Sequence, residues 1–359
     1  MDCSADGRIL SMSSDPGRPG RIPNGACQQG ATGATFMDGC APTPSAANAK
    51  RGNIMVDLFD IRYLRIGTPK LDDAIEFATK IVGLQLVARE GKAAYFRSDK
   101  VPVRGDTRDH TLVYFEGDPK DHSVGFDLRD PSEIDAVAAE LEKAGYPVRM
   151  GSKEESELRR TRQVLFSQDP SGNKIEIVAR PYHSGVRYHP TRDAGITNFS
   201  HIGLRTANPA RDEAFWTRVM NARVSDWVGE AALLRIDTIH HSLALFPSPF
   251  PGIQHINHQV EDIDDVMRSY YYLREKGVRI VWGPGRHPLS SAVMVYFEGP
   301  DGMVYEYSVG VKLIPHEDDA SYRPRQFPFE KFSLCMWGAV PEVREFEVKK
   351  TDSAPLRVV

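Results

Sequence analysis

GRHPLSSAVMVYFEGPDGMVYE, residues 285–306, is the stretch that decides the fold of this chain. Its Gly-Pro-Asp-Gly segment at 299–302 is a turn sequence, and strand-like runs flank it, so the stretch predicts a hairpin of strands at 292–297 and 303–309. Glu306 would lie inside the second strand, where burial of a carboxylate is costly unless something such as a metal ion pairs with it. On its own such a Glu would more often face solvent on an edge strand. Whether Glu306 is instead a metal ligand depends on the residues elsewhere in the chain.

The composition is that of an ordinary globular protein. The 359 residues are 41% hydrophobic and 26% charged, which suits two domains with a sizeable core. A net charge of −4 without a long basic run argues against nucleic-acid binding, and no stretch of about twenty apolar residues predicts a membrane span. The four cysteines form neither a disulfide framework nor a zinc pattern, so we expect a reducing, cytoplasmic location.

The chain repeats itself. Residues 62–77 (RYLRIGTPKLDDAIEF) align with 200–215 (SHIGLRTANPARDEAF), residues 109–115 with 240–246, and residues 169–176 with 299–306. Each half contains a strand, a helix and further strands, twice over; the first helix is expected to begin at Thr68-Pro69 and to end at Gly83. The sequence therefore predicts an α+β fold of two similar domains, each of paired βαβββ units forming a cupped, barrel-like mixed sheet.

The repeat and the composition predict the domain boundaries. Residues 1–54 are expected to be a disordered extension, because Gly, Ser, Ala, Pro and Asn dominate them without any period. A non-catalytic domain at 55–180, a linker at 181–196 and a catalytic, metal-binding domain at 197–313 follow. The tail at 314–359 is rich in aromatic and Arg residues and would pack over the barrel mouth, against a neighbouring subunit or on its own domain.

Three residues of the second half are candidate metal ligands: His201, His255 and Glu306. They lie on predicted strands at matching places in successive units, so a cupped sheet could bring them together. Two imidazoles and one carboxylate are the set associated with non-haem Fe(II) enzymes that activate oxygen, although zinc could use the same ligands. His258 and His240 are expected to point away from the site, because each is an odd number of positions from a candidate site residue.

Residues 196–310 resemble the catalytic domain of the type I extradiol ring-cleavage dioxygenases, of the vicinal oxygen chelate superfamily. The residues that carry the family signature are Gly285, His287, Val295-Tyr296, Pro300-Asp-Gly302 and Glu306. Gly299 departs from the family's usual residue before the proline, which affects a turn. The N-terminal half resembles the family's other domain, so the likeness spans roughly 57–313.

The resemblance implies a function and a site. The chain would use O2 and Fe(II), with Mn(II) as an alternative, for extradiol (meta) cleavage of a substituted catechol in aromatic-compound catabolism. His201, His255 and Glu306 would be the metal ligands. His241 would carry protons on the oxygen side, while His287 and Tyr296 would hold the catecholate oxygens. Taken singly, His287 could be a loop residue and Tyr296 an ordinary strand aromatic.

The sequence leaves the substrate ring open. Monocyclic catechols, 2,3-dihydroxybiphenyl-like diols and carboxylated catechols such as 2,3-dihydroxy-p-cumate all fit the resemblance, with a slight preference for a carboxylated ring. We therefore expect the chain to bind a catecholic small molecule and O2. We also expect it to form a homo-oligomer. Two other functions stay open: a non-enzymatic small-molecule-binding module, which would not need His241, His287 and Tyr296, and a glyoxalase-like isomerase or lyase, which would typically take ligands from more than one domain.

The N-terminal half lacks the complete set. The counterparts of His201, His255 and Glu306 are Tyr63, His122 and Glu176. Counting back from Glu176 places Glu157 and Phe166 at the positions of His287 and Tyr296, although His110 matches His241. Because two remaining donors make a poor catalytic iron site, this half is expected to be structural.

Overall fold

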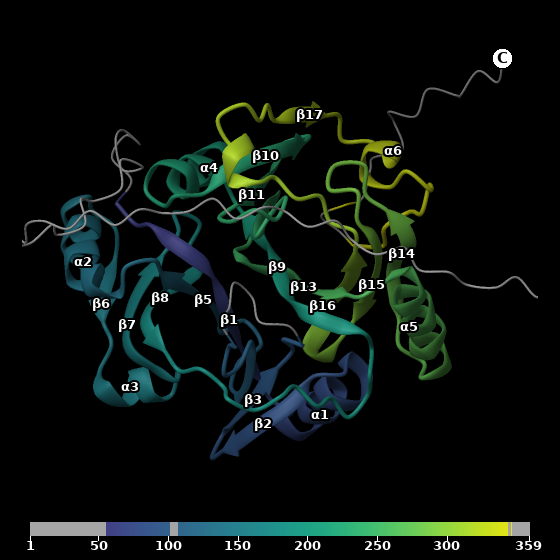
Figure 1. The fold of residues 1–359 in the computed structure, drawn as a ribbon, viewed down its shortest axis with the longest axis horizontal. Helices are drawn as coiled ribbons and strands as arrows, with labels where there is room; N and C mark the ends of the chain where they lie inside the picture. Colours follow the sequence, from purple (N-terminus) through teal and green to yellow (C-terminus); the bar gives the residue numbers. More distant parts are fainter. Residues whose placement is uncertain (1–54, 101–106, 344–345, 347–359) are drawn as a thin grey trace, which may run out of the picture. The chain divides into compact units, whose positions relative to one another are not determined.

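The computed structural model describes residues 55–100, 107–343 and 346, and the predicted disordered extension at 1–54 lies outside them. The described residues belong to one compact unit, residues 50–359. Within it, two mixed β-sheets follow each other along the chain, one from each half of the repeat (Figure 1). The helices of the described part are all too short or too polar to cross a bilayer.

The first sheet has eight strands in the order β2-β3-β4-β1-β5-β8-β7-β6. The strands are β1 (Leu58–Thr68), β2 (Gln85–Glu90), β3 (Ala93–Arg97), β4 (Leu112–Glu116), β5 (His122–Leu128), β6 (Val148–Met150), β7 (Thr161–Gln168) and β8 (Lys174–Pro181). The helical segments are α1 (Leu71–Glu76), which continues as the π-helix η2 (Phe77–Val82), η3 (Pro131–Glu133), α2 (Ile134–Lys143) and α3 (Lys153–Glu157). Each of its two βαβββ units contributes four strands, and the units meet where β1 pairs antiparallel with β5.

The second sheet repeats this order and adds one strand at an edge: β14-β15-β16-β13-β9-β12-β11-β10-β17. The strands are β9 (Ile196–Thr206), β10 (Arg223–Val228), β11 (Ala231–Arg235), β12 (Leu243–Pro247), β13 (Gly252–Val260), β14 (Ile280–Arg286), β15 (Val293–Glu298), β16 (Val304–Val309) and β17 (Arg325–Phe327). The helical segments are α4 (Pro209–Arg218), α5 (Ile263–Glu275), η4 (Pro300–Gly302), η5 (His316–Asp318) and α6 (Lys331–Leu334). The predicted α+β fold of two similar domains is confirmed.

The hairpin predicted at 292–309 is present. Strands β15 and β16 pair antiparallel, with Tyr296 directly opposite Glu306. The turn between them contains Asp301 at a φ of 56°, a left-handed conformation that Asp tolerates better than most residues. The first helix, by contrast, begins at Leu71 rather than at Pro69, because the φ of −129° and ψ of 69° at Lys70 lie outside the helical region. The predicted cap at Thr68-Pro69 was therefore wrong by two residues.

The leading strands of the two halves share one irregularity. In β1 the pairing with β5 shifts between Ile61 and Tyr63, and in β9 the pairing with β13 shifts between Phe199 and His201. One residue in each strand, Arg62 or Ser200, is thus the extra residue of a β-bulge. Such a bulge bends the strand and changes the direction of nearby side chains. In β9 it immediately precedes a candidate metal ligand.

One apolar core runs through both halves of the compact unit. The hydroxyls of Tyr114 and Tyr305, one from each half, hydrogen-bond in it at 2.5 Å. The described part of the tail packs on the second half, where β17 pairs parallel with β10. Leu334, Cys335, Val343 and Phe346 of the tail join a second apolar cluster of that half. The exact domain boundaries at 180, 196 and 313 stay predictions.

Candidate metal centre

Three adjacent strands of the second sheet bring the candidate ligands together. His201 lies on β9, His255 on β13 and Glu306 on β16, and the strands are neighbours in the order β16-β13-β9 (Figure 1). His201 Nε2 is 3.1 Å from both His255 Nε2 and Glu306 Oε2, and His255 Nε2 is 3.4 Å from Glu306 Oε2. All three side chains are at most 2% exposed.

This geometry fits a single metal ion. Donor atoms about 2.1 Å from an ion and at right angles to each other lie about 3.0 Å apart, close to the three distances observed. Among the described residues, these three form the group of His, Cys, Asp and Glu side chains that could hold an ion. The facing Nε2 atoms of His201 and His255 cannot both carry a proton without repulsion at 3.1 Å, and a shared cation removes that conflict.

The protonation states also suit metal binding, which needs a carboxylate and neutral imidazoles. Burial would raise the pKa of Glu306, but its interactions with the neighbouring imidazoles, first of all the hydrogen bond with His201, outweigh burial and hold this pKa below its usual range. Burial lowers the pKa of His255 to about 3, against the opposing attraction of Glu306. At neutral pH the site therefore presents a carboxylate and a neutral His255 imidazole.

The residue before His255 supports it. The side-chain oxygen of Gln254 accepts a hydrogen bond from His255 Nδ1, which leaves the lone pair of Nε2 free to bind a metal ion beside Glu306. Gly203 on the neighbouring strand provides the space, because a Cβ there would lie 2.5 Å from His255 Nδ1. Sequence reasoning did not identify Gln254, although a buried amide beside a candidate ligand is a usable signal.

The other three candidates line a small cavity beside the ligands. His241, His287 and Tyr296 surround a space of about 50 Å³ together with His255 and mainly apolar side chains. The residues that complete the lining are Val228, Leu233, Phe246, Trp282, Leu289, Ser290, Ser333, Leu334 and Phe346. The structure thus brings all six sequence-predicted site residues to one place, and their roles stay proposals.

His287 and Tyr296 are oriented by hydrogen bonds. His287 Nδ1 donates to the backbone carbonyl of Leu334 in α6, at 2.9 Å, so its Nε2 carries no proton when the ring is neutral. Nε2 then accepts from the Tyr296 hydroxyl at 3.1 Å and lies 3.6 Å from Glu306 Oε1. Burial raises the pKa of Tyr296 well above its ordinary value, so its hydroxyl stays a donor.

His241 is held by a chain of polar groups that the sequence did not reveal. Asp226 on β10 accepts from His240 Nε2 at 2.9 Å, and the Nδ1 atoms of His240 and His241 are 3.2 Å apart. Because the carboxylate fixes the proton of His240 on Nε2, His241 Nδ1 must donate and His241 Nε2 is left as the acceptor. Arg325 of the tail completes the chain with a 2.6 Å ion pair to Asp226.

The expectations for the two neighbouring histidines had different outcomes. His258 lies in the core, stacked on Tyr305 at 6.3 Å between ring centroids, away from the cavity. His240 is not directed to the cavity either, but it is fully buried against His241 and so belongs to the site's support. The adjacent pair His240-His241, just before β12, was the signal that could have shown this.

The first half has an ion pair where the second has the ligand cluster. Glu176 is buried and accepts hydrogen bonds from Tyr63, at 2.7 Å, and Ser123, and it forms a two-point ion pair with Arg159. His122 lies apart from these groups, its Nε2 accepting from the Ile253 N–H. Phe166 faces Glu176 as Tyr296 faces Glu306, whereas Glu157 is exposed.

Known proteins resemble the chain over most of its length. A biphenyl-2,3-diol 1,2-dioxygenase from Sphingomonas paucimobilis is 24% identical over 74% of this chain and 92% of its own length. An iron-dependent extradiol dioxygenase from Rhodococcus jostii (strain RHA1) is 27% identical over 77% of the chain and 95% of its own length. The crystal structure of BphC, a halotolerant catechol dioxygenase, superposes with a TM-score of 0.69 at 23% identity and covers 81% of the chain and 97% of its own.

A protein-family model gives the assignment. The model described as the Glyoxalase/Bleomycin resistance protein/Dioxygenase superfamily matches residues 60–177 and 198–307, one match in each repeat and together more than half of the chain. The two matches coincide with the two sheets. The chain therefore belongs to the Glyoxalase/Bleomycin resistance protein/Dioxygenase superfamily, in which its named relatives are extradiol dioxygenases.

Proposed function

We propose that this protein is an extradiol dioxygenase that cleaves a substituted catechol with O2 at one Fe(II) ion. The observation that carries the proposal is the convergence of His201, His255 and Glu306, whose donor atoms lie 3.1–3.4 Å apart beside a cavity. Mn(II) is the alternative metal, because nitrogen and carboxylate donors suit both ions. Similarity to the iron-dependent relative supports Fe(II).

The ion, when bound, would supply the redox chemistry that couples the catechol to O2. The side chains around it manage protons and orientation. His241, with its unprotonated Nε2, would accept a proton from the catechol and return it later in the reaction. The Tyr296 hydroxyl would donate to one catecholate oxygen, and His287 would orient that hydroxyl through its bare Nε2.

The lining of the cavity favours an uncharged ring substituent. Phe246, Trp282, Leu289 and Phe346 are apolar, and among the described lining residues there is no Lys or Arg. A carboxylate placed against such a wall would be desolvated without a partner, which is costly. A 2,3-dihydroxybiphenyl-like diol is therefore the substrate class we propose, rather than the carboxylated catechol that the sequence slightly favoured. Similarity to the biphenyl-2,3-diol dioxygenase supports this choice.

Anaerobic reconstitution with Fe(II), followed by addition of O2 and a catechol, tests the function. We expect one O2 molecule to be consumed per catechol and a coloured ring-fission product to form. We expect 2,3-dihydroxybiphenyl to be turned over faster than 2,3-dihydroxy-p-cumate. Tight catechol binding without oxygen uptake would support the small-molecule-binding module instead. Metal-dependent turnover of a substrate without oxygen uptake would support the glyoxalase-like isomerase or lyase.

The oligomeric state is a separate proposal. We retain the homo-oligomer expected from the resemblance, and sedimentation equilibrium of the purified protein measures it directly. A single species at the mass of one chain, 40.1 kDa, would contradict it.

A further inference from the structure

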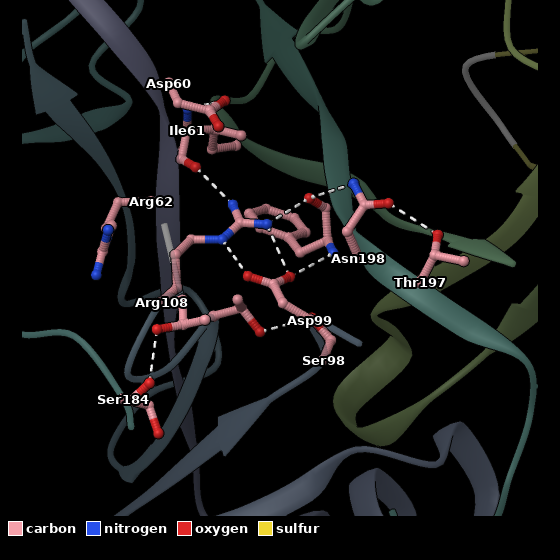
Figure 2. A network of polar contacts seen from close by, with 12 residues as sticks. Asp60, Ile61, Arg62, Ser98, Asp99, Arg108, Ser184, Thr197 and Asn198 are labelled. Atoms are coloured by element: carbon pink, nitrogen blue, oxygen red, sulfur yellow. Dashed lines mark hydrogen bonds and ion pairs between the residues drawn. The ribbon is translucent and has the colours of Figure 1, made fainter. Parts of the chain in front are cut away.

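Arg108 joins equivalent backbone positions of the two repeats. Its guanidinium donates from Nη1 to the carbonyl of Ile61, at 2.8 Å, and from Nη2 to the carbonyl of Phe199, at 2.9 Å (Figure 2). Ile61 on β1 and Phe199 on β9 lie two residues before Tyr63 and His201, the paired positions of the repeat. The Arg108 side chain is only 3% exposed, so this contact is made away from water.

Asp99 completes the contact with β9. Its carboxylate accepts from Arg108 Nε at 2.5 Å and Nη2 at 2.8 Å, and it also accepts from the Phe199 backbone N–H at 3.2 Å. Arg108 and Asp99 together therefore hold both the N–H and the carbonyl of Phe199. Burial opposes the charge of Arg108, but attraction to Asp99 outweighs it and raises the pKa of Arg108 above its ordinary value.

These contacts take the place of a neighbouring strand. On that side of β9, strand β12 begins to pair only at Ile202, and the residues of β9 before it have no strand partner from β12. Lys100 donates its backbone N–H to the Thr197 carbonyl at 2.8 Å, and the Arg108–Asp99 pair binds Phe199 next along β9. The first half thus supplies the hydrogen bonds that this edge of β9 lacks.

The position of this contact gives it a role beyond general stability. Phe199 and His201 flank the bulged residue Ser200, where the regular β9–β13 ladder is interrupted. A bulge leaves the local strand direction less constrained, so an additional fixed point is needed to set where the next side chain points. Phe199 is that fixed point, one residue before the bulge, and His201 comes one residue after it.

We infer that Arg108, through Asp99 and the backbone of Phe199, is a positioning residue for the metal ligand His201. The non-catalytic half would thereby determine the metal affinity of the catalytic half. This inference rests on the proposed function only insofar as His201 is taken as a ligand. Arg suits the task because its planar fork binds two carbonyls and a carboxylate at once, which an ammonium group on a single stem does not.

The chain offers a matched control. Arg62 and Asp127 form a second buried Arg–Asp pair, at 3.3 Å, with side chains 2% and 10% exposed. Arg62 also binds a backbone carbonyl, that of Tyr182 at 2.7 Å, and these two contacts lie within the first half and its linker. Loss of this pair removes comparable buried polar contacts without freeing Phe199.

The test compares the double variant Arg108→Met/Asp99→Leu, which buries no unpaired charge, with the control Arg62→Met/Asp127→Leu. Mn(II) alone is titrated into each metal-free protein, with free Mn(II) followed by electron paramagnetic resonance. We call the Arg108→Met/Asp99→Leu protein and its Arg108→Lys counterpart the clamp variants. We expect the double clamp variant to bind Mn(II) at least tenfold more weakly than wild type and the control to stay within about twofold. Equal affinities of the clamp variant and wild type, or equal losses in both variants, would overturn the inference.

Arg108→Lys provides the test if the double variant does not fold. It keeps the charge but cannot reach both carbonyls and Asp99, so we expect a weakened Mn(II) affinity with the fold retained. Unchanged Mn(II) affinity in a folded Arg108→Lys protein would count against the positioning role. The matched control Arg62→Lys should leave the Mn(II) affinity unaltered.

A metal-independent measurement separates this inference from the proposed function. Hydrogen exchange at the amides of Phe199 and His201 in the metal-free protein should be faster in the clamp variants than in wild type and unaltered in the controls. Faster exchange with unchanged Mn(II) affinity would overturn the positioning role alone. A wild-type protein that binds Mn(II) through His201 but cleaves no catechol would overturn the proposed function alone.

Discussion

The guanidinium of Arg159 forms a two-point ion pair with Glu176, at 2.7 and 2.8 Å. Glu176 is the residue of the first repeat that corresponds to Glu306 of the second. A side-chain cation thus neutralises the buried carboxylate where the second repeat has two imidazoles. Burial would raise the pKa of Glu176, but Arg159 outweighs it and the pKa is lowered. In the first repeat the buried carboxylate of Glu176 is thus paired with a side-chain cation, Arg159.

This arrangement predicts that the first half binds no catalytic metal. His122→Ala and Glu176→Ala should leave one metal ion per chain and a nearly unchanged kcat. Glu176→Ala should still lower the free energy of unfolding, by about 3 kcal/mol, because it leaves the partly buried Arg159 without its carboxylate partner. Metal analysis and urea unfolding measure the two effects. Loss of a second metal ion on mutation of His122 would show a second working site.

The ligand set gives the second prediction. His201→Ala, His255→Ala and Glu306→Ala should each abolish ring cleavage and most metal retention, since a three-ligand site has no spare donor. His258→Phe is the matched control, because His258 is an equally buried histidine of the same strand as His255 that does not line the cavity. Full metal content and activity in any of the three Ala variants would remove that residue from the site.

The third prediction concerns proton transfer. His241→Phe should keep the metal and lower kcat by roughly a hundredfold, the usual scale for a lost acid–base group. Asp226→Asn should lower kcat by about tenfold or more, because it loosens the proton position on His240 and hence on His241. Asp319→Asn, which disturbs an Arg–Asp pair elsewhere in the same half, serves as the control. Equal kcat for the two Asn variants would remove Asp226 from the mechanism.

The fourth prediction is a pH dependence of stability. Burial lowers the pKa of His110 from 6.5 to about 4. Because the unfolded chain binds this proton more readily, the contribution is fully present above pH 6.5 and is lost as the pH falls from 6.5 to 4. The loss is about 3 kcal/mol for this group. His110→Phe should therefore lose less stability than wild type between pH 7.5 and 4.5 in urea titrations of the metal-free proteins; parallel losses would contradict the prediction.

The fifth prediction concerns the size of the substrate. The ring of Phe346 packs against Phe246 and Trp282, with centroids 4.7 and 5.0 Å away, and helps to limit the cavity to about 50 Å³. A cavity of about 150 Å³ binds benzene, so an aromatic diol can enter here only if lining side chains such as Phe346 move aside. Phe346→Ala should raise kcat/KM for bicyclic diols relative to catechol by about tenfold. Phe329→Ala, from the same apolar cluster but outside the cavity lining, should leave that ratio unchanged.

The sequence predicted what local patterns encode. The repeat of 62–77 in 200–215 predicted the fold, and the turn at 299–302 fixed the register that places Tyr296 opposite Glu306. His201, His255 and Glu306 could be selected from their matching places in successive units, whereas His241, His287 and Tyr296 were implied by the family resemblance. The starting point of the first helix was missed by two residues, because Lys70 has a non-helical backbone conformation that residue type does not specify.

The supporting contacts could not be predicted because they join residues far apart in sequence. Arg159 reaches Glu176 only through the geometry of β7 and β8, and Asp226 meets His240 only because β10 lies two strands from β12. The Leu334 carbonyl that orients His287 is a backbone group and leaves no trace in residue type. Such partners depend on how segments that are distant in sequence pack together, which no single motif in this chain specifies.

The contact between His287 and the Leu334 carbonyl also sets an order of assembly. All three candidate metal ligands precede residue 307, whereas Leu334 and Phe346 leave the ribosome after them. During synthesis the ligand strands can thus meet before Ser333, Leu334 and Phe346 complete the wall of the cavity. An ion that bound at that stage would enter a site still open on one side, and these three residues would then close over it.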